Sequence, residues 1–146
     1  MRSNNPKKFF TKEEEDKIVS AIKSAEMETS GEIRVHLERK IDGDIIKKTI
    51  QIFNKIGMSN TRERNGCLIV IDLTNKKFAV IGDMGINEKV GELFWNEITD
   101  IFSVYFKKNE FAEGLTKGIL KIGEKLKYYF PCQSNDINEL SDEISK

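Results

Sequence analysis

The chain has no excess of charge of either sign, because 24 Lys and Arg residues balance 24 Asp and Glu residues over its 146 positions. The basic residues are scattered, apart from short pairs such as Lys7-Lys8 and Lys107-Lys108. A protein that binds nucleic acid usually carries a clustered basic patch. We therefore expect no nucleic-acid partner.

Long hydrophobic runs are also missing. No stretch approaches the ~18 consecutive apolar residues that a membrane span needs, and the first ten residues, M-R-S-N-N-P-K-K-F-F, contain no signal-peptide core. The sequence predicts a cytoplasmic protein without a membrane span. With 38% hydrophobic residues, a chain of this length fits one domain, which we expect to be a monomer.

Cysteine and histidine are scarce. Cys67 and Cys132 lie far apart in the sequence, and Cys67 begins the most apolar segment, which favours a buried, reduced thiol over a disulfide or redox role. His36 is the only histidine and is flanked by Val35 and Leu37, so we expect a structural role for it. So few His and Cys residues also argue against a structural zinc site.

The common phosphate and zinc motifs are absent: there is no C-x5-R loop, P-loop, G-x-G-x-x-G or H-E-x-x-H. The segment Asp42-Gly43-Asp44 resembles the D-x-D-x-[TV] start of aspartyl phosphatases, but Ile46 stands where Thr or Val is expected. A turn followed by a helix cap is the favoured interpretation. The catalytic residues, if there are any, stay unknown at this point.

Hydrophobic periodicity predicts the elements in order. Residues 1–10 form a flexible arm, and Thr11 with Glu14 makes a capping box at the start of the first helix. Further helices are expected at about 44–56, 87–106 and 111–129, with a polar tail at 132–146 that is either disordered or a short helix around 137–144. The apolar positions assigned to the second helix are Ile46, Ile50, Phe53 and Ile56, and those assigned to the third are Val90, Leu93, Phe94, Ile98, Ile101, Phe102 and Tyr105.

Strands are expected at 32–38, 67–73 and 77–81. The first alternates apolar and polar residues, while 67–73 is almost wholly apolar, as in a central strand covered on both faces. The first two strands should run parallel and be joined by the helix at 44–56, and the third should run antiparallel to the second. The predicted fold is α/β, a three-layer αβα sandwich with a small mixed sheet of three to four strands and about four helices. Glycines in the last helix predict tight packing, with the sheet as the expected neighbour.

Several short motifs resemble the TPM family, the thylakoid-lumen acid-phosphatase-like proteins. They occur in the family's order, and the likeness covers about residues 10–131, so 11–131 is taken as a stand-alone TPM-like domain. The motifs are T-S-G-E-I-R-V (29–35), R-N-G-C-L-I-V-I (64–71), G-D-M-G-I-N (82–87), F-W (94–95), F-K-K-N-E-F-A-E-G-L (106–115) and Y-F-P (129–131). The resemblance implies an αβα fold and, for some members, divalent-metal binding and weak phosphatase activity.

The predicted topology brings the starts of the first two strands and the end of the third to one edge. Oxygen-bearing side chains gather there: Glu32, Glu63, Asn65, Asp83, Asn87 and Glu88. Calcium binds six to eight such oxygens on flexible loops. We take Asp83, Glu63, Glu32, Asn87 and Glu88 as the candidate ligands for Ca²⁺ or another divalent cation. An EF-hand is excluded, because Phe94 stands where its last glutamate belongs.

Other interpretations of the same residues stay open. Asp83 and Asn87 also fit a role as caps of the following helix. Arg62 and Arg64 fit binding of phosphate or of a partner's carboxylate, or a solvated surface. The favoured function is a metal-ordered module that interacts with an unknown protein partner. The alternative is a metal-dependent acid phosphatase acting on phosphomonoesters.

Overall fold

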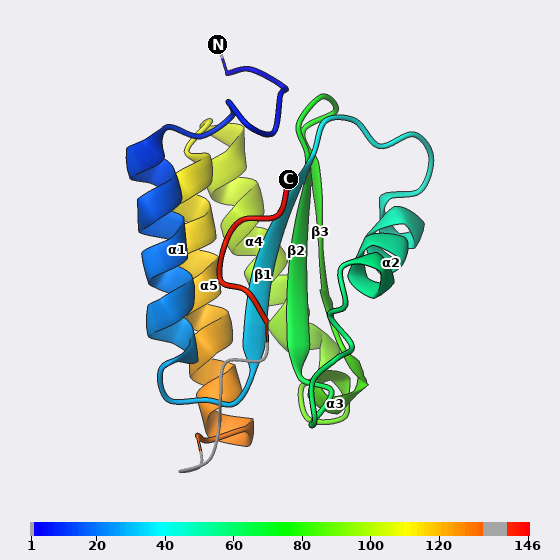
Figure 1. The fold of residues 1–146 in the computed structure, drawn as a ribbon, viewed down its shortest axis with the longest axis vertical. Helices are drawn as coiled ribbons and strands as arrows, with labels where there is room; N and C mark the ends of the chain where they lie inside the picture. The colour runs from blue at the N-terminus through cyan, green and yellow to red at the C-terminus, as the bar shows by residue number, and fades with distance from the viewer. Residues whose placement is uncertain (1, 133–139) are drawn as a thin grey trace.

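The computed structural model describes residues 2–132 and 140–146. In this part of the chain a three-stranded sheet in the order β1-β2-β3 is covered by helices on both faces (Figure 1). Helices α1, α4 and α5 cover one face, and α2 covers the other. The α/β sandwich predicted from the sequence is confirmed, with three strands and five helices. The elements are α1 (Lys12–Glu26), β1 (Glu32–Glu38), α2 (Ile45–Lys55), β2 (Gly66–Asp72), β3 (Lys77–Gly82), α3 (Met84–Asn87), α4 (Glu92–Lys107) and α5 (Phe111–Tyr129).

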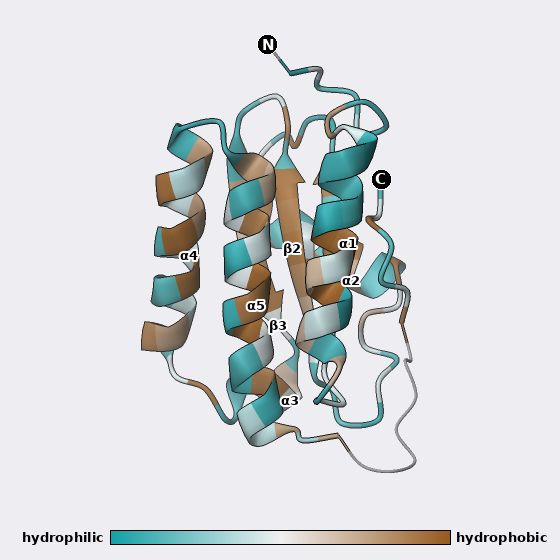
Figure 2. Cartoon of the chain, turned by 90° about the vertical axis from the view of Figure 1, so that its left-hand side faces the viewer, coloured by the Kyte–Doolittle hydropathy of each residue, from teal (hydrophilic) through white to brown (hydrophobic). Residues whose placement is uncertain are grey.

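The sheet is mixed, as the sequence predicts. β1 runs parallel to β2, and β3 runs antiparallel to β2. Every residue of β2 is buried, which explains its apolar run from Cys67 to Ile71. Alternate side chains of β2 enter two cores: Cys67, Ile69 and Ile71 face α1 and α5, while Leu68 and Val70 pack with α2. Figure 2 shows the apolar colour of β2 behind the three helices.

The N-terminal segment set aside as an arm contributes to the main core. Phe9 and Phe10 are buried, and their rings meet edge to face. Arg2 forms an ion pair with Glu14, which also belongs to the capping box at Thr11. That pair lowers the pKa of Glu14 to about 2. The domain packing therefore begins before residue 11.

The predicted helix at 87–106 begins at the wrong place. Asp83 caps a separate single turn, α3, and Gly91 in extended conformation precedes α4. Leu93, predicted to be buried, is 84% exposed on the first turn of α4. The break follows from two competing start signals, the Asp83 cap and Gly91.

The buried face of α2 also differs from the prediction. Ile46 and Ile50 are each 48% exposed, whereas Thr49, Ile52 and Phe53 are buried against the sheet. Isoleucines lie on two neighbouring stripes of this helix, so helical periodicity alone did not select one. The sheet selects the stripe that contains Ile52 and Phe53.

The glycines of α5 approach neighbouring helices, not the sheet. A Cβ at Gly118 would lie 2.2 Å from Cε1 of Phe102 on α4. Gly123 meets Ala25 of α1 in the same way. Close packing at these glycines was predicted correctly, but the predicted neighbour was wrong.

The described part of the C-terminal tail, residues 140–146, contains no helix and lies along β1 (Figure 1). Ser145 makes a parallel bridge to His36, with N–H bonds from Ser145 to Val35 O and from Leu37 to Ser145 O, each 2.8 Å. Ile144 enters the main core. The rest of the helix expected at 137–144 lies outside the described residues. In the described chain, no helix combines the length and hydropathy that crossing a membrane requires.

Candidate metal centre

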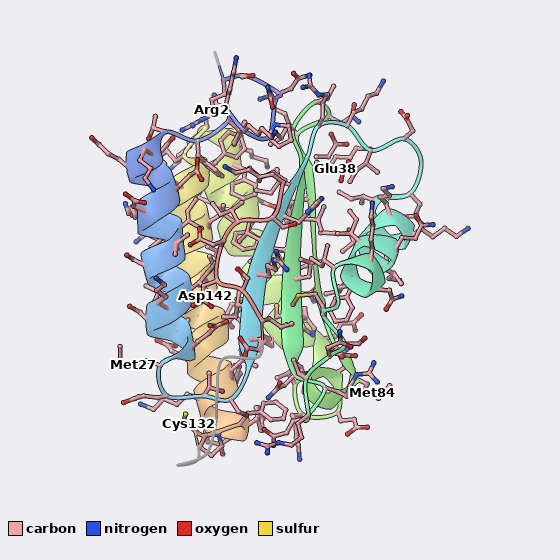
Figure 3. All side chains as sticks on the ribbon, viewed as in Figure 1. Arg2, Met27, Glu38, Met84, Cys132 and Asp142 are labelled. Carbon is pink, nitrogen blue, oxygen red and sulfur yellow. The ribbon has the colours of Figure 1, made fainter. Side chains whose placement is uncertain are left out.

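Three loops meet at one edge of the sheet, here called the loop edge and made of residues 27–32, 60–66 and 82–88. Glu32 pairs with Gly66, and Cys67 pairs with Gly82, so the starts of β1 and β2 lie beside the end of β3. This is the convergence that the sequence predicts. Met27 and Met84, labelled in Figure 3, lie toward this end of the molecule, and Glu38 lies toward the opposite end.

Asp83 and Arg64 join two of these loops by a two-point ion pair. Arg64 Nε donates to Asp83 Oδ2 at 2.7 Å, and Nη2 donates to Oδ1 at 3.0 Å. Asp83 Oδ1 also accepts the N–H of Met84 at 2.8 Å and so caps α3. The Asp83 side chain is only 7% exposed, while that of Arg64 is 41% exposed. The hydrogen bonds to Asp83 raise the pKa of Arg64, so this guanidinium stays charged.

Gly85 is where the backbones of the two loops touch. Its N–H donates to Arg64 O at 2.9 Å, and a Cβ at this position would lie 2.1 Å from Glu63 O and 2.6 Å from Arg64 O. Arg64 adopts a left-handed φ of 52°, which is uncommon for a residue other than glycine. Two backbone carbonyl oxygens therefore gather beside the loop that carries Asp83.

Glu63 belongs to a hydrogen-bonded chain that reaches the loop before β1. Its carboxylate accepts the hydroxyl of Ser30, and Ser30 Oγ accepts Asn65 Nδ2 at 3.1 Å. Asn65 is 1% exposed, and its Oδ1 has no hydrogen-bond partner among the described residues. A buried amide oxygen without a donor is costly, so Asn65 offers this edge an unsatisfied oxygen ligand.

Glu32 lies in a different acidic group, with Glu26 from α1 and Asp142 from the tail. Carboxylate oxygens of the three residues all lie within 4.8 Å of one another. Glu26 accepts the N–H of Ile33 at 2.7 Å. Burial, followed by a hydrogen bond with Asp142, raises the pKa of Glu26 well above its ordinary value. Close carboxyl groups of this kind bind a proton or a cation between them.

Asn87 and Glu88 lie on and just after α3. Asn87 Nδ2 donates to Gly82 O at 2.8 Å, and its Oδ1 accepts Trp95 Nε1 at 3.2 Å, so this amide links β3 to α4. The side chain of Glu88 is exposed at the C-cap of α3. The capping role considered for Asp83 is present in the structure, whereas Asn87 makes a different contact.

The five predicted ligands therefore fall into three settings along one edge. Asp83 and Glu63 lie on facing loops, Glu32 lies with Glu26 and Asp142, and Asn87 and Glu88 lie at the C-terminal end of α3. Sequence reasoning missed Glu26 and Asp142, because one resembles a solvated residue of a helix end and the other lies in a polar tail. Arg64 was noted, but its pairing with Asp83 was not.

Two further groups with general-base or nucleophilic chemistry are His36 and Cys67. His36 Nε2 contacts Glu38 Oε1 and Nδ1 contacts Ser145 Oγ, both at 2.8 Å, so both ring nitrogens have a partner. Cys67 is a free, fully buried thiol, as predicted, and burial raises its pKa to about 12.

Of the larger hollows described in the surface, the most spacious lies at the other end of the molecule. It has a volume of about 810 Å³ and is lined by Arg2, Thr11, Glu14, Lys76 and Asn109. Its lining charges include the Arg2–Glu14 ion pair already described. Among the hollows described, none is lined by a residue of the loop edge.

Comparison with known proteins agrees with this fold. The TPM domain family matches residues 3–125. A solved structure of the BA42 protein from the psychrophilic bacterium Bizionia argentinensis is 42% identical, with 99% of each chain covered and a TM-score of 0.91. No curated protein matches the chain.

A more distant structure shares the fold alone. It is the N-terminal domain of a protein from P. gingivalis, 17% identical, with a TM-score of 0.65, covering 88% of this chain and 82% of that one. The αβα arrangement is therefore retained where little of the sequence is.

Proposed function

The chain belongs to the TPM domain family, and we propose that it acts there as a divalent-cation-binding module, with Ca²⁺ as the expected ion. The ion joins the loop at 60–66 to the loop at 82–88 and orders both. The ordered loop edge then presents a surface to a protein partner. The contact of Gly85 with the carbonyl groups of Glu63 and Arg64, beside Asp83, is the observation that carries this proposal.

The donor atoms in these loops fit a hard cation. Asp83 and Glu63 provide carboxylates, Glu63 and Arg64 provide backbone carbonyls, and Asn65 provides a buried amide oxygen without a donor. Calcium prefers this mixture of oxygen types on loops that can adjust. Glu32, Asn87 and Glu88 remain candidate ligands at the margin of the same edge, with Glu32 nearest to the Glu26–Asp142 pair.

The alternative, a metal-dependent acid phosphatase, has less support. Arg64, one of the two arginines expected to stabilise a phosphate, pairs with Asp83. His36 lies four residues along β1 from Glu32, which is about 13 Å at the rise of a strand, and Cys67 is buried. Hydrolysis of a phosphomonoester that is lost in Asp83→Ala but retained in Asp100→Ala would favour the enzyme.

The test is a titration of metal-stripped, ¹⁵N-labelled protein with CaCl₂, with MgCl₂ as the comparison. We expect saturable shifts confined to residues 60–66 and 82–90, and their loss in Asp83→Asn. Asp100→Asn, which removes an equal charge from an exposed position of α4, should titrate like the parent protein. Unchanged spectra at millimolar calcium would end the proposal. Shifts centred on Glu26, Glu32 and Asp142 would instead place the ion at that acidic group.

A further inference from the structure

Asp83 already holds a cation, the guanidinium of Arg64. Both carboxylate oxygens accept hydrogen bonds from it, Oδ2 from Nε at 2.7 Å and Oδ1 from Nη2 at 3.0 Å. Oδ1 is also engaged by the N–H of Met84. These three bonds fill three of the roughly four lone-pair sites of the carboxylate, so an ion that binds Asp83 through both oxygens must displace an arginine bond.

The two cations cannot share this carboxylate on equal terms. A guanidinium two-point pair uses the oxygen lone pairs that a metal needs, and a divalent ion beside the guanidinium adds like-charge repulsion. The Asp83 side chain, at 7% exposure, is held by its cap on α3, whereas that of Arg64, at 41%, reaches toward solvent. The residue with freedom to leave is Arg64.

We propose that Arg64 is a tethered competitor for the cation at Asp83, so that metal binding expels its guanidinium from the carboxylate into solvent. This inference rests on the proposed function, since it describes how the same site is regulated. In the metal-free state Arg64 balances the charge of Asp83 and holds the two loops together. In the metal-bound state the ion takes over both tasks.

The position of Arg64 in the backbone fits this exchange. Its carbonyl accepts the N–H of Gly85 at 2.9 Å, so the main chain stays anchored when the side chain departs. The carbonyl of Arg64 is thus a candidate ligand in the metal-bound state, whereas its guanidinium binds Asp83 in the metal-free state. The exchange needs only a side-chain rotation.

The consequence is a metal affinity weakened by the protein itself. Arg64→Gln removes the competing charge, and we expect its calcium dissociation constant to fall about two- to fivefold, as for the loss of one exposed ion pair. Arg64→Lys keeps the charge but not the two-point geometry and should lie between the two. Arg62→Gln is the matched control, because it removes the same charge from an exposed neighbour in the same loop.

The direct readout is the side-chain Nε–H signal of Arg64, followed by ¹H–¹⁵N NMR of the unmodified protein during the calcium titration. We expect a signal shifted by the Asp83 hydrogen bond that moves toward solvent-exposed values in step with the backbone shifts. Isothermal titration calorimetry of the three variants gives the affinities.

The outcomes separate the two proposals. Backbone shifts at Asp83 with an unmoved Arg64 signal, and equal affinities of Arg64→Gln and Arg62→Gln, would overturn the competitor and leave the cation site standing. Unchanged backbone spectra would overturn both. A moving Arg64 signal with tighter binding only in the Arg64 variants would establish the exchange.

Discussion

Carboxylate oxygens of Glu26 and Asp142 lie within 4.8 Å of each other. Burial and this neighbouring carboxyl raise the pKa of Glu26, so we expect the pair to hold a proton at neutral pH. Glu26 is the last residue of α1. Asp142, labelled in Figure 3, lies in the tail. The shared proton therefore fastens the C-terminal tail to the body of the domain.

This proton makes stability depend on pH in a direction opposite to that of most acidic residues. Burial and the Asp142 bond raise the pKa of Glu26 in the folded state above its unfolded value of about 4.5. The stabilising contribution is complete below that unfolded value and is lost progressively as the pH rises toward the folded value. Glu26 is thus a site where alkaline conditions weaken the fold.

Glu26→Gln should therefore stabilise the protein at pH 7.5. An amide accepts the N–H of Ile33 and donates to Asp142 without the need for a proton. We expect the free energy of unfolding to rise by at least about 1.4 kcal/mol, the equivalent of one pKa unit, and the difference to vanish near pH 4. Urea denaturation at both pH values measures it. Glu124→Gln, at an exposed position of α5, should have no comparable effect, and a loss of stability at pH 7.5 in Glu26→Gln would contradict the shared proton.

Ile144→Ala should loosen the tail from β1. Ile144 is 8% exposed in the main core, and truncating a buried isoleucine costs about 2 kcal/mol or more. The Leu37 amide, which donates to Ser145 O, should then exchange faster with solvent, while amides of β2 keep their protection. Hydrogen exchange followed by NMR tests this. Val104→Ala is the control, because Val104 lies on α4 and is 52% exposed. Unchanged exchange of the Leu37 amide in Ile144→Ala would show that the position of the tail does not depend on Ile144.

Local sequence patterns were enough to predict helices and strands whose packing partners lie close in the sequence. β2 was recognisable because residues 67–71 are all apolar, and the β2–β3 turn because polar residues interrupt two apolar runs. The stripe of α2 that is buried was not recognisable, since Ile46 and Ile52 are equally apolar and only the sheet distinguishes them. The break before α4 was missed because Asp83 and Gly91 are both good helix starts.

The candidate site divides in the same way. Strand order and direction were enough to bring Asp83 and Glu63 to one edge. They did not reveal that Arg64 would form an ion pair with Asp83, because that pairing depends on side-chain directions in two loops. The contact of Glu26 with Asp142 depends on the course of the tail, for which the sequence carries no local signal.

The two cysteines should differ sharply in reactivity. Cys132 is exposed, whereas Cys67 is fully buried with a pKa of about 12, so little of it is thiolate at neutral pH. We expect one thiol per native chain to react with a disulfide reagent at pH 7.5, and two in denaturant. In Cys132→Ser the native count should fall to zero, and rapid reaction of Cys67 in that variant would show that β2 opens readily.

Gly85→Ala should separate the two loops. The added Cβ would lie 2.1 Å from Glu63 O, a distance that the backbones relieve only by moving apart. We expect a loss of about 1–3 kcal/mol in the free energy of unfolding, as for other overpacked sites. The Gly85–Arg64 hydrogen bond should weaken, which NMR shifts at residues 63–66 and 83–86 would report.

Gly91→Ala is the matched control for this change, because no atom outside its immediate chain neighbours lies within 4 Å of the new Cβ. As an N-cap substitution it should cost about 0.5–1 kcal/mol, since Ala caps a helix less well than Gly. If calcium joins the two loops, Gly85→Ala should also weaken calcium binding, while Gly91→Ala should not. Equal stability and equal binding in both variants would mean that the contact between Gly85 and Glu63 constrains neither the loops nor the ion.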